Sequence, residues 1–554
     1  MKLNKYIALG GLALGLSMSS CIGDLDLEPN DPNYGNATDY AAVLAKCYSG
    51  MAVSGQDGPG SSDISGLDNG RGQYCRAIFM MNEFPTDECL WIWKDEGIYD
   101  ICTNSFDASN GNIYGTYSRL YSHIAVCNDF IANARTNSDP VVQDMVLQAR
   151  TLRAMSYYWV VDIFGQGSFI TEEAAVGENP VQKSRLDLYN WLKDELEDIV
   201  AKFKDSDMPV AYGHVGLDGA QALLSRLYLN AKVYTDGKQE GWAECQKHCE
   251  EIIARHKGGG FNGSGLANHY LYLFCRDNHV YMPGGGNTAE NEILWGLAFE
   301  PYYTQSYGAA NFIICASITT ANMDNNGFSM SSANYGMVNE WTCMHGRKEF
   351  FDKFTDGDKR SSLWLKEDDG FTRENTDYST FNNGYATVKF TNLIAGTDGG
   401  WSQENGGIYG PVDSEGKPTM AANTQNWPDT DYPLIRLADV YLMYTECFIM
   451  GNVGDQAKAL RYASYVSERA GQRAWVEGDL TADNILDERA RELYWELTRR
   501  SDLVRHDKYT GGRYLWSWKG NVAEGNSINE RYKLMPIPVQ IISAQPEFKQ
   551  NPGY

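Results

Sequence analysis

Apolar residues spaced three and four positions apart recur along this chain, and this spacing places them on one face of an α-helix. The pattern covers residues 142–159 and 220–231. After a Thr-Asp-Gly turn the second segment is followed by another over 242–252, and a similar pair covers 435–450 and 454–470. Such pairs form helical hairpins of the size found in tetratricopeptide repeats, although no strict 34-residue period accompanies them. The sequence therefore predicts a mainly α-helical fold.

Long stretches separate these helical segments, at about 51–75, 256–290 and 366–430, and they are dense in Gly, Asn, Asp, Ser and Tyr. Such a composition cannot form regular helix. Loops of this length in a compact domain are usually functional or disordered, and the many aromatic residues favour ordered loops that present a ligand. The 554 residues are 43% apolar, enough for a large core without disulfides, and we expect one domain over 39–554.

The N-terminus has the features of a secretory signal peptide over residues 1–20. Two lysines precede an apolar run at 6–16, and small residues follow before Cys21. A cysteine in this position predicts a lipidated N-terminus; the alternative is a soluble exported protein with an incidental cysteine. Residues 21–38 are rich in Asp, Asn, Pro and Gly and predict a flexible tether. No later apolar stretch is long enough for a transmembrane helix.

The chain carries a formal net charge of −25, which argues against nucleic acid and anionic lipid as partners. This charge neither favours nor opposes the binding of neutral ligands such as sugars. Besides Cys21 there are eleven scattered cysteines and no C-x-x-C pair, so the sequence indicates neither a disulfide framework nor a zinc site. The pair closest in sequence, Cys245 and Cys249, shares a helix face with Trp242 and Ile252, which favours core packing over metal binding.

Several sequence blocks are distinctive: NEFPTDECLW at 82–91, ARTLRAMSYYWVVDIFG at 149–165, and the C-terminal series RRSDLVR, YLWSWKG and MPIPVQ between 499 and 540. Through these blocks the chain resembles the SusD/RagB family of surface glycan-binding lipoproteins. The run Gly-Asp-Leu-Asp at 23–26 is similar to the signal that sends Bacteroidetes lipoproteins to the cell surface. The likeness covers nearly the whole chain, except for about 355–426.

The resemblance implies a non-enzymatic protein with four tetratricopeptide-like hairpins on one side. It also implies a ligand face of irregular loops with little β structure. Such a protein would be lipid-anchored at the surface of the outer membrane. There it would capture starch-like α-glucan chains for a SusC-like TonB-dependent transporter, over whose mouth it would sit as a lid.

The resemblance also implies an arc of three aromatic rings, contributed by Trp93, Tyr307 and Trp341. Such rings suit the apolar faces of a pyranose, although core packing is the ordinary role of any single one. Trp91 lies two residues before Trp93, so one of the two indoles could pack beneath the other, and we expect Trp93 to be the exposed one.

Polar grips implied by the family are Arg76 and Asp68, which together could hold adjacent sugar hydroxyls; each could instead belong to a surface ion pair. Glu96 stands where the family has an asparagine. Because an ionised carboxylate accepts but does not donate, this difference leaves the exact glucan open.

Asp429 and Asp431 resemble acidic residues that hold a structural calcium ion in the family, and no other cofactor is expected. Paired carboxylates suit calcium, and the alternative is N-capping of the helix predicted near 435.

Three other functions remain open from the sequence. The protein could bind a different glycan, act as a surface glycosidase, or serve as a scaffold for the transporter without binding sugar. A glycosidase needs two carboxyl groups, which sequence spacing cannot find among 72 Asp and Glu residues. The chain contains no G-x-S-x-G, H-E-x-x-H or P-loop string.

Overall fold

The computed structural model describes residues 39–554 except 176, 207, 279–288, 318–334, 363 and 396–425. Residues 43–554 form one compact unit. The predicted signal peptide, Cys21 and the tether lie outside the described residues, and the domain boundary at residue 39 stays a prediction. Within the described part of the chain, no helix is both long and apolar enough to pass through a lipid bilayer.

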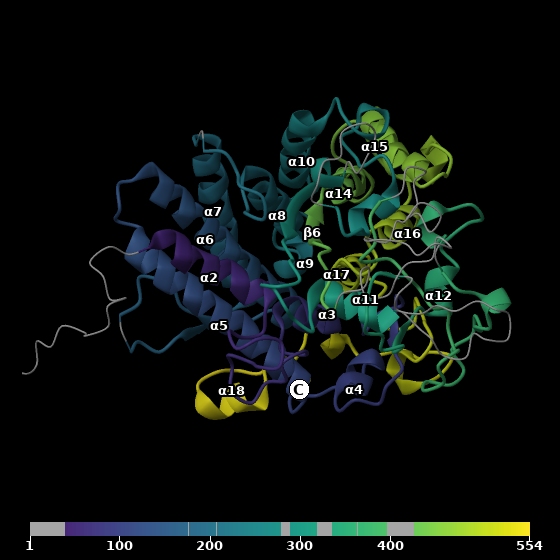
Figure 1. The fold of residues 1–554 in the computed structure, drawn as a ribbon, viewed down its shortest axis with the longest axis horizontal. Helices are drawn as coiled ribbons and strands as arrows, with labels where there is room; N and C mark the ends of the chain where they lie inside the picture. Colours follow the sequence, from purple (N-terminus) through teal and green to yellow (C-terminus); the bar gives the residue numbers. More distant parts are fainter. Residues whose placement is uncertain are drawn as a thin grey trace, which may run out of the picture. The chain divides into compact units, whose positions relative to one another are not determined.

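The described residues are mainly helical, as the sequence predicts (Figure 1). The longer helices are α2 (Tyr40–Ala52), α3 (Tyr74–Asn82), α5 (Gly111–Ala134), α6 (Pro140–Trp159), α7 (Arg185–Lys204), α8 (Leu217–Leu229), α10 (Trp242–His256), α11 (Ala309–Ser317), α14 (Leu437–Gly451), α15 (Gln456–Arg469) and α16 (Ala482–Leu493). The shorter ones are α4 (Ile98–Cys102), α9 (Ala231–Tyr234), α12 (Lys348–Phe351), α17 (Arg499–Arg505) and α18 (Val539–Ala544).

The named strands of the described residues pair into three two-stranded antiparallel sheets. Their strands are β1 (Leu90–Trp91) with β5 (Met344–His345), β2 (Gly167–Phe169) with β3 (Val181–Lys183), and β4 (Ile293–Leu297) with β6 (Tyr432–Arg436). The sheets β1–β5 and β4–β6 each pair segments that are more than 130 residues apart in sequence. Strand pairing therefore holds distant parts of the chain side by side.

The helical hairpins expected from the sequence are present. Helices α8 and α10 pack against each other, as do α14 and α15, and further contacts link α5 to α6, α6 to α7, α7 to α8 and α10 to α14. The apolar stripes account for this packing, because Leu223, Leu227, Cys245 and Cys249 are all fully buried. Helix starts follow capping chemistry: the Asp139 carboxylate accepts the Val141 N–H at the start of α6.

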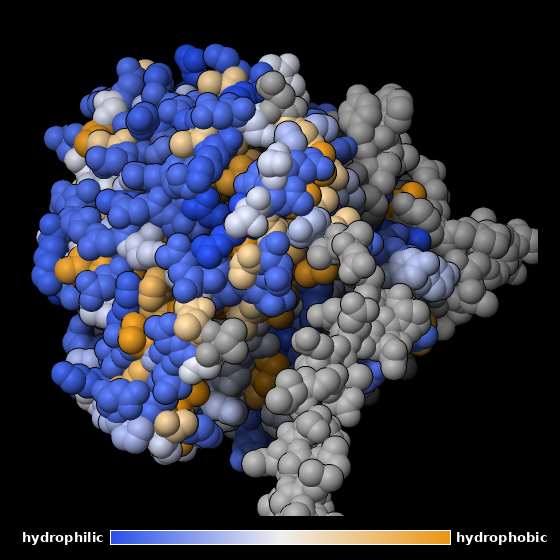
Figure 2. Space-filling model, turned by 90° about the vertical axis from the view of Figure 1, so that its left-hand side faces the viewer, coloured by the Kyte–Doolittle hydropathy of each residue, from blue (hydrophilic) through white to orange (hydrophobic). Residues whose placement is uncertain are grey.

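The face of the molecule shown in Figure 2 is largely hydrophilic, with hydrophobic residues scattered among polar ones. This distribution agrees with amphipathic helices that turn their apolar stripes toward the core.

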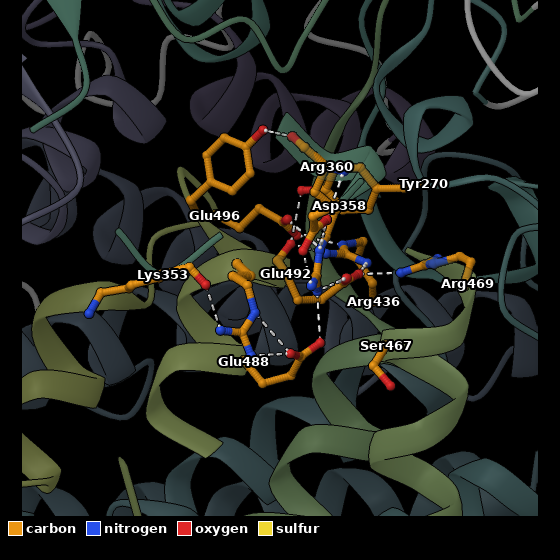
Figure 3. Close-up of polar contacts among 12 residues, drawn as sticks. Tyr270, Lys353, Asp358, Arg360, Arg436, Ser467, Arg469, Glu488, Glu492 and Glu496 are labelled. Carbon is orange, nitrogen blue, oxygen red and sulfur yellow. Dashed lines mark hydrogen bonds and ion pairs between the residues drawn. The ribbon is translucent and has the colours of Figure 1, made fainter. Parts of the chain in front are cut away.

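A network of buried ion pairs joins the hairpins to the irregular segments (Figure 3). Arg436, at the end of β6, pairs with Glu292 at 2.5 Å and with Glu496 at 2.6 Å. Arg436 and Arg469 both pair with Glu492 on α16. These side chains are almost fully excluded from solvent, so each charge depends on its partners for stabilisation.

Candidate functional site

An open groove on the irregular segments brings together five of the six binding residues expected from the sequence. Its lining comes from the loop before α3, from α3, from the segment around β1, from the segment before α11 and from the segment before β5: Asp68, Asn69, Gly70, Arg71, Arg76, Trp91, Trp93, Asp95, Tyr307 and Trp341. Its volume is about 260 Å³, below the roughly 300–1,000 Å³ of pockets that enclose a small molecule. The groove therefore suits part of a long ligand.

Backbone hydrogen bonds hold the aromatic segments in place. The Ile92 N–H donates to Cys343 O at 2.8 Å, continuing the pairing of β1 with β5. The Trp341 N–H donates to Cys315 O at 2.7 Å, near the end of α11. Two residues far apart in sequence, Trp93 and Trp341, are thus carried to one site by strand pairing and by one helix end.

Trp91 is buried and Trp93 is exposed, which answers the question of which indole packs beneath the other. Trp91 is 1% exposed and its Nε1 donates to Asp95 Oδ2 at 2.9 Å, whereas Trp93 is 38% exposed. The two rings meet edge to face with centroids 5.7 Å apart. Trp93 is therefore the exposed indole and Trp91 packs beneath it.

Tyr307 and Trp341 lie half-buried on another wall of the groove. Their ring centroids are 6.2 Å apart and their planes are inclined by 46°. Trp427 meets Tyr307 edge to face at 4.9 Å. Trp427 was not predictable from the sequence, because it follows a long segment without periodicity. The aromatic rings are thus neither scattered nor sealed inside the protein.

Arg76 forms the floor of the groove. It is 8% exposed, and its guanidinium carbon lies 4.6 Å from the ring centroid of Phe312 and 5.5 Å from that of Trp341. Its Nη1 donates to Tyr307 O at 3.1 Å. Burial lowers the pKa of Arg76 to about 10, so the group is still charged at neutral pH. The alternative prediction that Arg76 belongs to a surface ion pair is wrong, because its side chain is buried among aromatic rings.

Asp68 does form the surface ion pair that the sequence analysis considered, and its partner is Arg71 at 3.6 Å. Its Oδ1 also accepts the backbone N–H of Gly70 at 2.9 Å and of Arg71 at 2.7 Å. Partial burial acts to raise the pKa of Asp68, but these hydrogen bonds and the Arg71 charge bring it below the ordinary value. Asp68 is therefore a fixed, ionised acceptor. Sequence reasoning missed Arg71, although it stands three residues along the same turn.

Glu96 lies beside the aromatic groove, in an adjoining pocket that shares Asp68 and Arg71 with it. The other residues of this pocket are mostly glycines: Gly66, Leu67, Gly72, Gly111, Asn112 and Gly115. The Glu96 carbonyl accepts from Asn112 Nδ2 at 3.0 Å, which fixes the backbone and leaves the carboxylate exposed. The two hollows form a continuous surface on either side of the Asp68–Arg71 pair.

Asp429 and Asp431 are not among the residues that line the groove. Asp429 pairs with Arg276 at 3.2 Å, and Asp431 Oδ1 accepts the Phe299 N–H at 2.8 Å. Burial raises the pKa of Asp431 to about 8. Helix capping, the alternative for this pair, is wrong because strand β6 follows Asp431 and α14 begins only at Leu437. The calcium site stays a prediction.

Fold and groove together define a class: a protein of helical hairpins that presents an open aromatic binding groove on irregular loops. Comparisons with known proteins identify the family. Residues 291–554 match the SusD family. The starch-binding protein SusD of Bacteroides thetaiotaomicron is 30% identical over 98% of this chain and 97% of its own length. The chain belongs to the SusD family.

Solved structures support the same fold at lower identity. A SusD superfamily protein from Parabacteroides distasonis covers 94% of this chain and 100% of its own, with a TM-score of 0.65 and 18% identity. Surface glycan-binding protein A from Bacteroides thetaiotaomicron, solved in complex with laminarihexaose, covers 92% and 98%, with a TM-score of 0.61 and 17% identity.

Proposed function

We propose that this protein captures α-glucan chains at the cell surface by stacking sugar rings on Trp93, Tyr307 and Trp341. The observation that carries the proposal is the convergence of these three rings, over the Arg76 floor, in one open groove. Aromatic faces match the C–H faces of a pyranose, and the ionised Asp68 beside Arg71 offers an acceptor and donors for hydroxyl groups. Membership in a family with a starch-binding relative supports the same ligand class.

The inclination of the rings favours a curved ligand. Tyr307 and Trp341 are tilted by 46°, so consecutive sugars that contact both cannot lie in one plane. An α-1,4-glucan has this curvature, whereas a flat ribbon such as cellulose does not. Affinity should be modest, because sugar hydroxyls exchange water for protein partners with little net gain.

Binding without hydrolysis fits the carboxyl groups of the groove. Glycoside hydrolysis needs one carboxyl group that stays protonated near neutral pH. Asp68, the carboxyl group beside Arg71, has a pKa below its ordinary value and is therefore ionised near neutral pH. Incubation with soluble starch or pullulan should release no reducing ends, and sustained release would show that the protein is a glycosidase.

Affinity electrophoresis through gels containing glycogen or amylopectin tests the binding proposal. Wild type should be retarded, and the double variant Trp93→Ala, Trp341→Ala should lose most of this retardation. Phe381→Ala is a matched control, because Phe381 is 45% exposed and does not line the groove. If wild type is retarded by a β-glucan gel but not by α-glucan gels, the ligand is a β-glucan and the α-glucan proposal is wrong. Absence of retardation in both gels would favour a scaffold that binds no sugar.

We also propose a lipid anchor at Cys21 and delivery of the glycan to a SusC-like TonB-dependent transporter. Membership in the SusD family supports a location at the surface of the outer membrane. Cys21→Ser should remove the acyl chains from the N-terminal peptide in mass spectrometry and release the protein from the membrane fraction. Copurification from detergent extracts tests the transporter, and recovery of the protein alone would contradict that partner.

A further inference from the structure

A second pocket lies on the helical part of the molecule, at the connection between α15 and α16. It has a volume of about 260 Å³, the same as the aromatic groove. Trp475 supplies an aromatic side chain to its lining, and Gln472, Arg473, Asp479 and Asn484 supply amide and charged groups. No residue of this pocket lines the groove, so the two sites are separate.

The charges of the pocket are balanced in pairs. Arg473 grips Asp479 with two parallel hydrogen bonds of 2.6 and 2.8 Å. Arg491 pairs with Glu488 at 2.5 Å, and Glu488 is 2% exposed. A pocket with equal numbers of cations and carboxylates gives no net attraction to an ion, and it therefore suits a neutral ligand with many hydroxyl groups.

Contacts beneath the pocket fix part of its lining. Glu488 also binds Arg360 of the buried network at 2.8 Å, which fixes the pocket floor. In Figure 3, Glu488 and Ser467 lie on two different helices, and the Ser467 hydroxyl donates to Arg473 O at 2.9 Å. Preorganised polar groups cost little entropy when they bind, which matters most for weak ligands such as sugars.

We infer that this pocket is a second carbohydrate-binding site, which takes one or two sugar units against Trp475. The inference rests on the proposed function, since the same glycan would occupy both sites. Two weak sites on one protein bind a polymer more tightly than either alone, because the second contact is intramolecular. A short oligosaccharide cannot benefit in this way.

This difference gives the test. Trp475→Ala should raise the apparent Kd for glycogen, measured from gel mobility, about tenfold. The calorimetric Kd for maltoheptaose in the groove should stay within about twofold of wild type. Val476→Ala is the matched control, because Val476 is the adjacent exposed apolar residue and does not line the pocket. Asn484→Ala is a second pocket variant that leaves the indole in place.

Fluorine NMR of protein labelled with 5-fluorotryptophan reports the pocket directly. In the Trp93→Ala, Trp341→Ala background, millimolar maltoheptaose should shift one resonance, and that resonance should vanish in Trp475→Phe. An unshifted Trp475 resonance together with unchanged gel mobility of Trp475→Ala overturns the second site while the groove proposal stands. Absence of any α-glucan binding by wild type overturns both.

Discussion

Gly70 lies where the loop before α3 meets two side chains of the aromatic groove. A Cβ atom placed there would be 2.6 Å from Arg76 Nη1 and 3.2 Å from Tyr307 Cβ. Gly70→Ala should therefore displace the floor of the groove and weaken maltoheptaose binding about tenfold, or about 1.4 kcal/mol, by calorimetry. Gly60→Ala is the control in the same loop, since its Cβ would meet no atom within 4 Å. Equal affinity of both variants would mean that Arg76 and Tyr307 are dispensable.

Gly111 tests whether the ligand extends past the Asp68–Arg71 pair into the adjoining pocket. This glycine is the first residue of α5, and an added Cβ meets open space. Gly111→Leu also improves helix propensity, so the fold should tolerate it. We expect about fivefold weaker binding of maltoheptaose with maltotriose unaffected, because only the longer chain reaches the filled pocket. Gly111→Ala should bind both sugars normally; loss of maltotriose binding in Gly111→Leu would contradict a separate subsite.

Single side chains were predictable from the sequence to different degrees. Residues of the groove could be named through the family resemblance, but their partners could not. We expected Asp68 to act together with Arg76. In the structure Asp68 pairs with Arg71 of the same turn, and Arg76 lies beneath the aromatic rings. Strand alternation put Trp91 and Trp93 on one side without saying which is covered. Turns and ring packing decide such questions, and neither leaves a periodic signal.

Helices α10 and α14 approach each other closely at Gly451, the last residue of α14. A Cβ atom there would lie 2.4 Å from Trp242 Cγ on α10. Gly451→Ala should force the two helices apart and lower the free energy of unfolding by about 1–3 kcal/mol in urea titrations. Gly478→Ala, whose Cβ would meet nothing within 4 Å, should leave stability unchanged. Glycan affinity should be normal in both, and weakened binding would show that hairpin packing shapes the groove.

Helices with a regular spacing of apolar residues could be predicted from the sequence, and strands of two residues could not. The segments expected at 435–450 and 454–470 are helices at 437–451 and 456–469, because Gly451 and Gly454 end one stripe before the other begins. In contrast, β1 and β5 have two residues each, too few for any alternation. They are about 250 residues apart, so their pairing depends on the packing of everything between them. This pairing nevertheless places Trp93 and Trp341.

The buried ion network makes the stability of residues 43–554 depend on a few charges. Glu492 on α16 binds Arg436 at 2.9 Å and Arg360 at 3.2 Å, and it also pairs with Arg469. Arg360, Arg436 and Arg469 lie 132, 56 and 23 residues from Glu492 along the chain. The spacing of charges along the chain does not indicate which pairs become buried together, so these pairs were not predictable from the sequence. Removing one partner from such a network leaves charges without compensation in a region that excludes water.

Glu492→Gln should therefore lower the free energy of unfolding at pH 7 by about 3–5 kcal/mol. Burial acts to raise the pKa of Glu492, but Arg469, Arg436 and Arg360 together hold it below its ordinary value. In the same network Arg360 and Arg491 lower the pKa of Glu488 to about 2, against the effect of burial. A carboxyl group with a depressed pKa stabilises the fold above its unfolded pKa of about 4.3 and loses this contribution as pH falls toward the folded pKa.

Wild type should accordingly lose stability steeply between about pH 4 and pH 2, and Glu492→Gln should lose less over the same interval, because glutamine cannot be protonated there. Urea unfolding at pH 7, 4 and 3, followed by tryptophan fluorescence, measures both effects. Glu477→Gln is the control, since Glu477 is exposed and should match wild type at every pH. Parallel acid profiles for wild type and Glu492→Gln would show that Glu492 is not among the carboxylates whose protonation unfolds the protein.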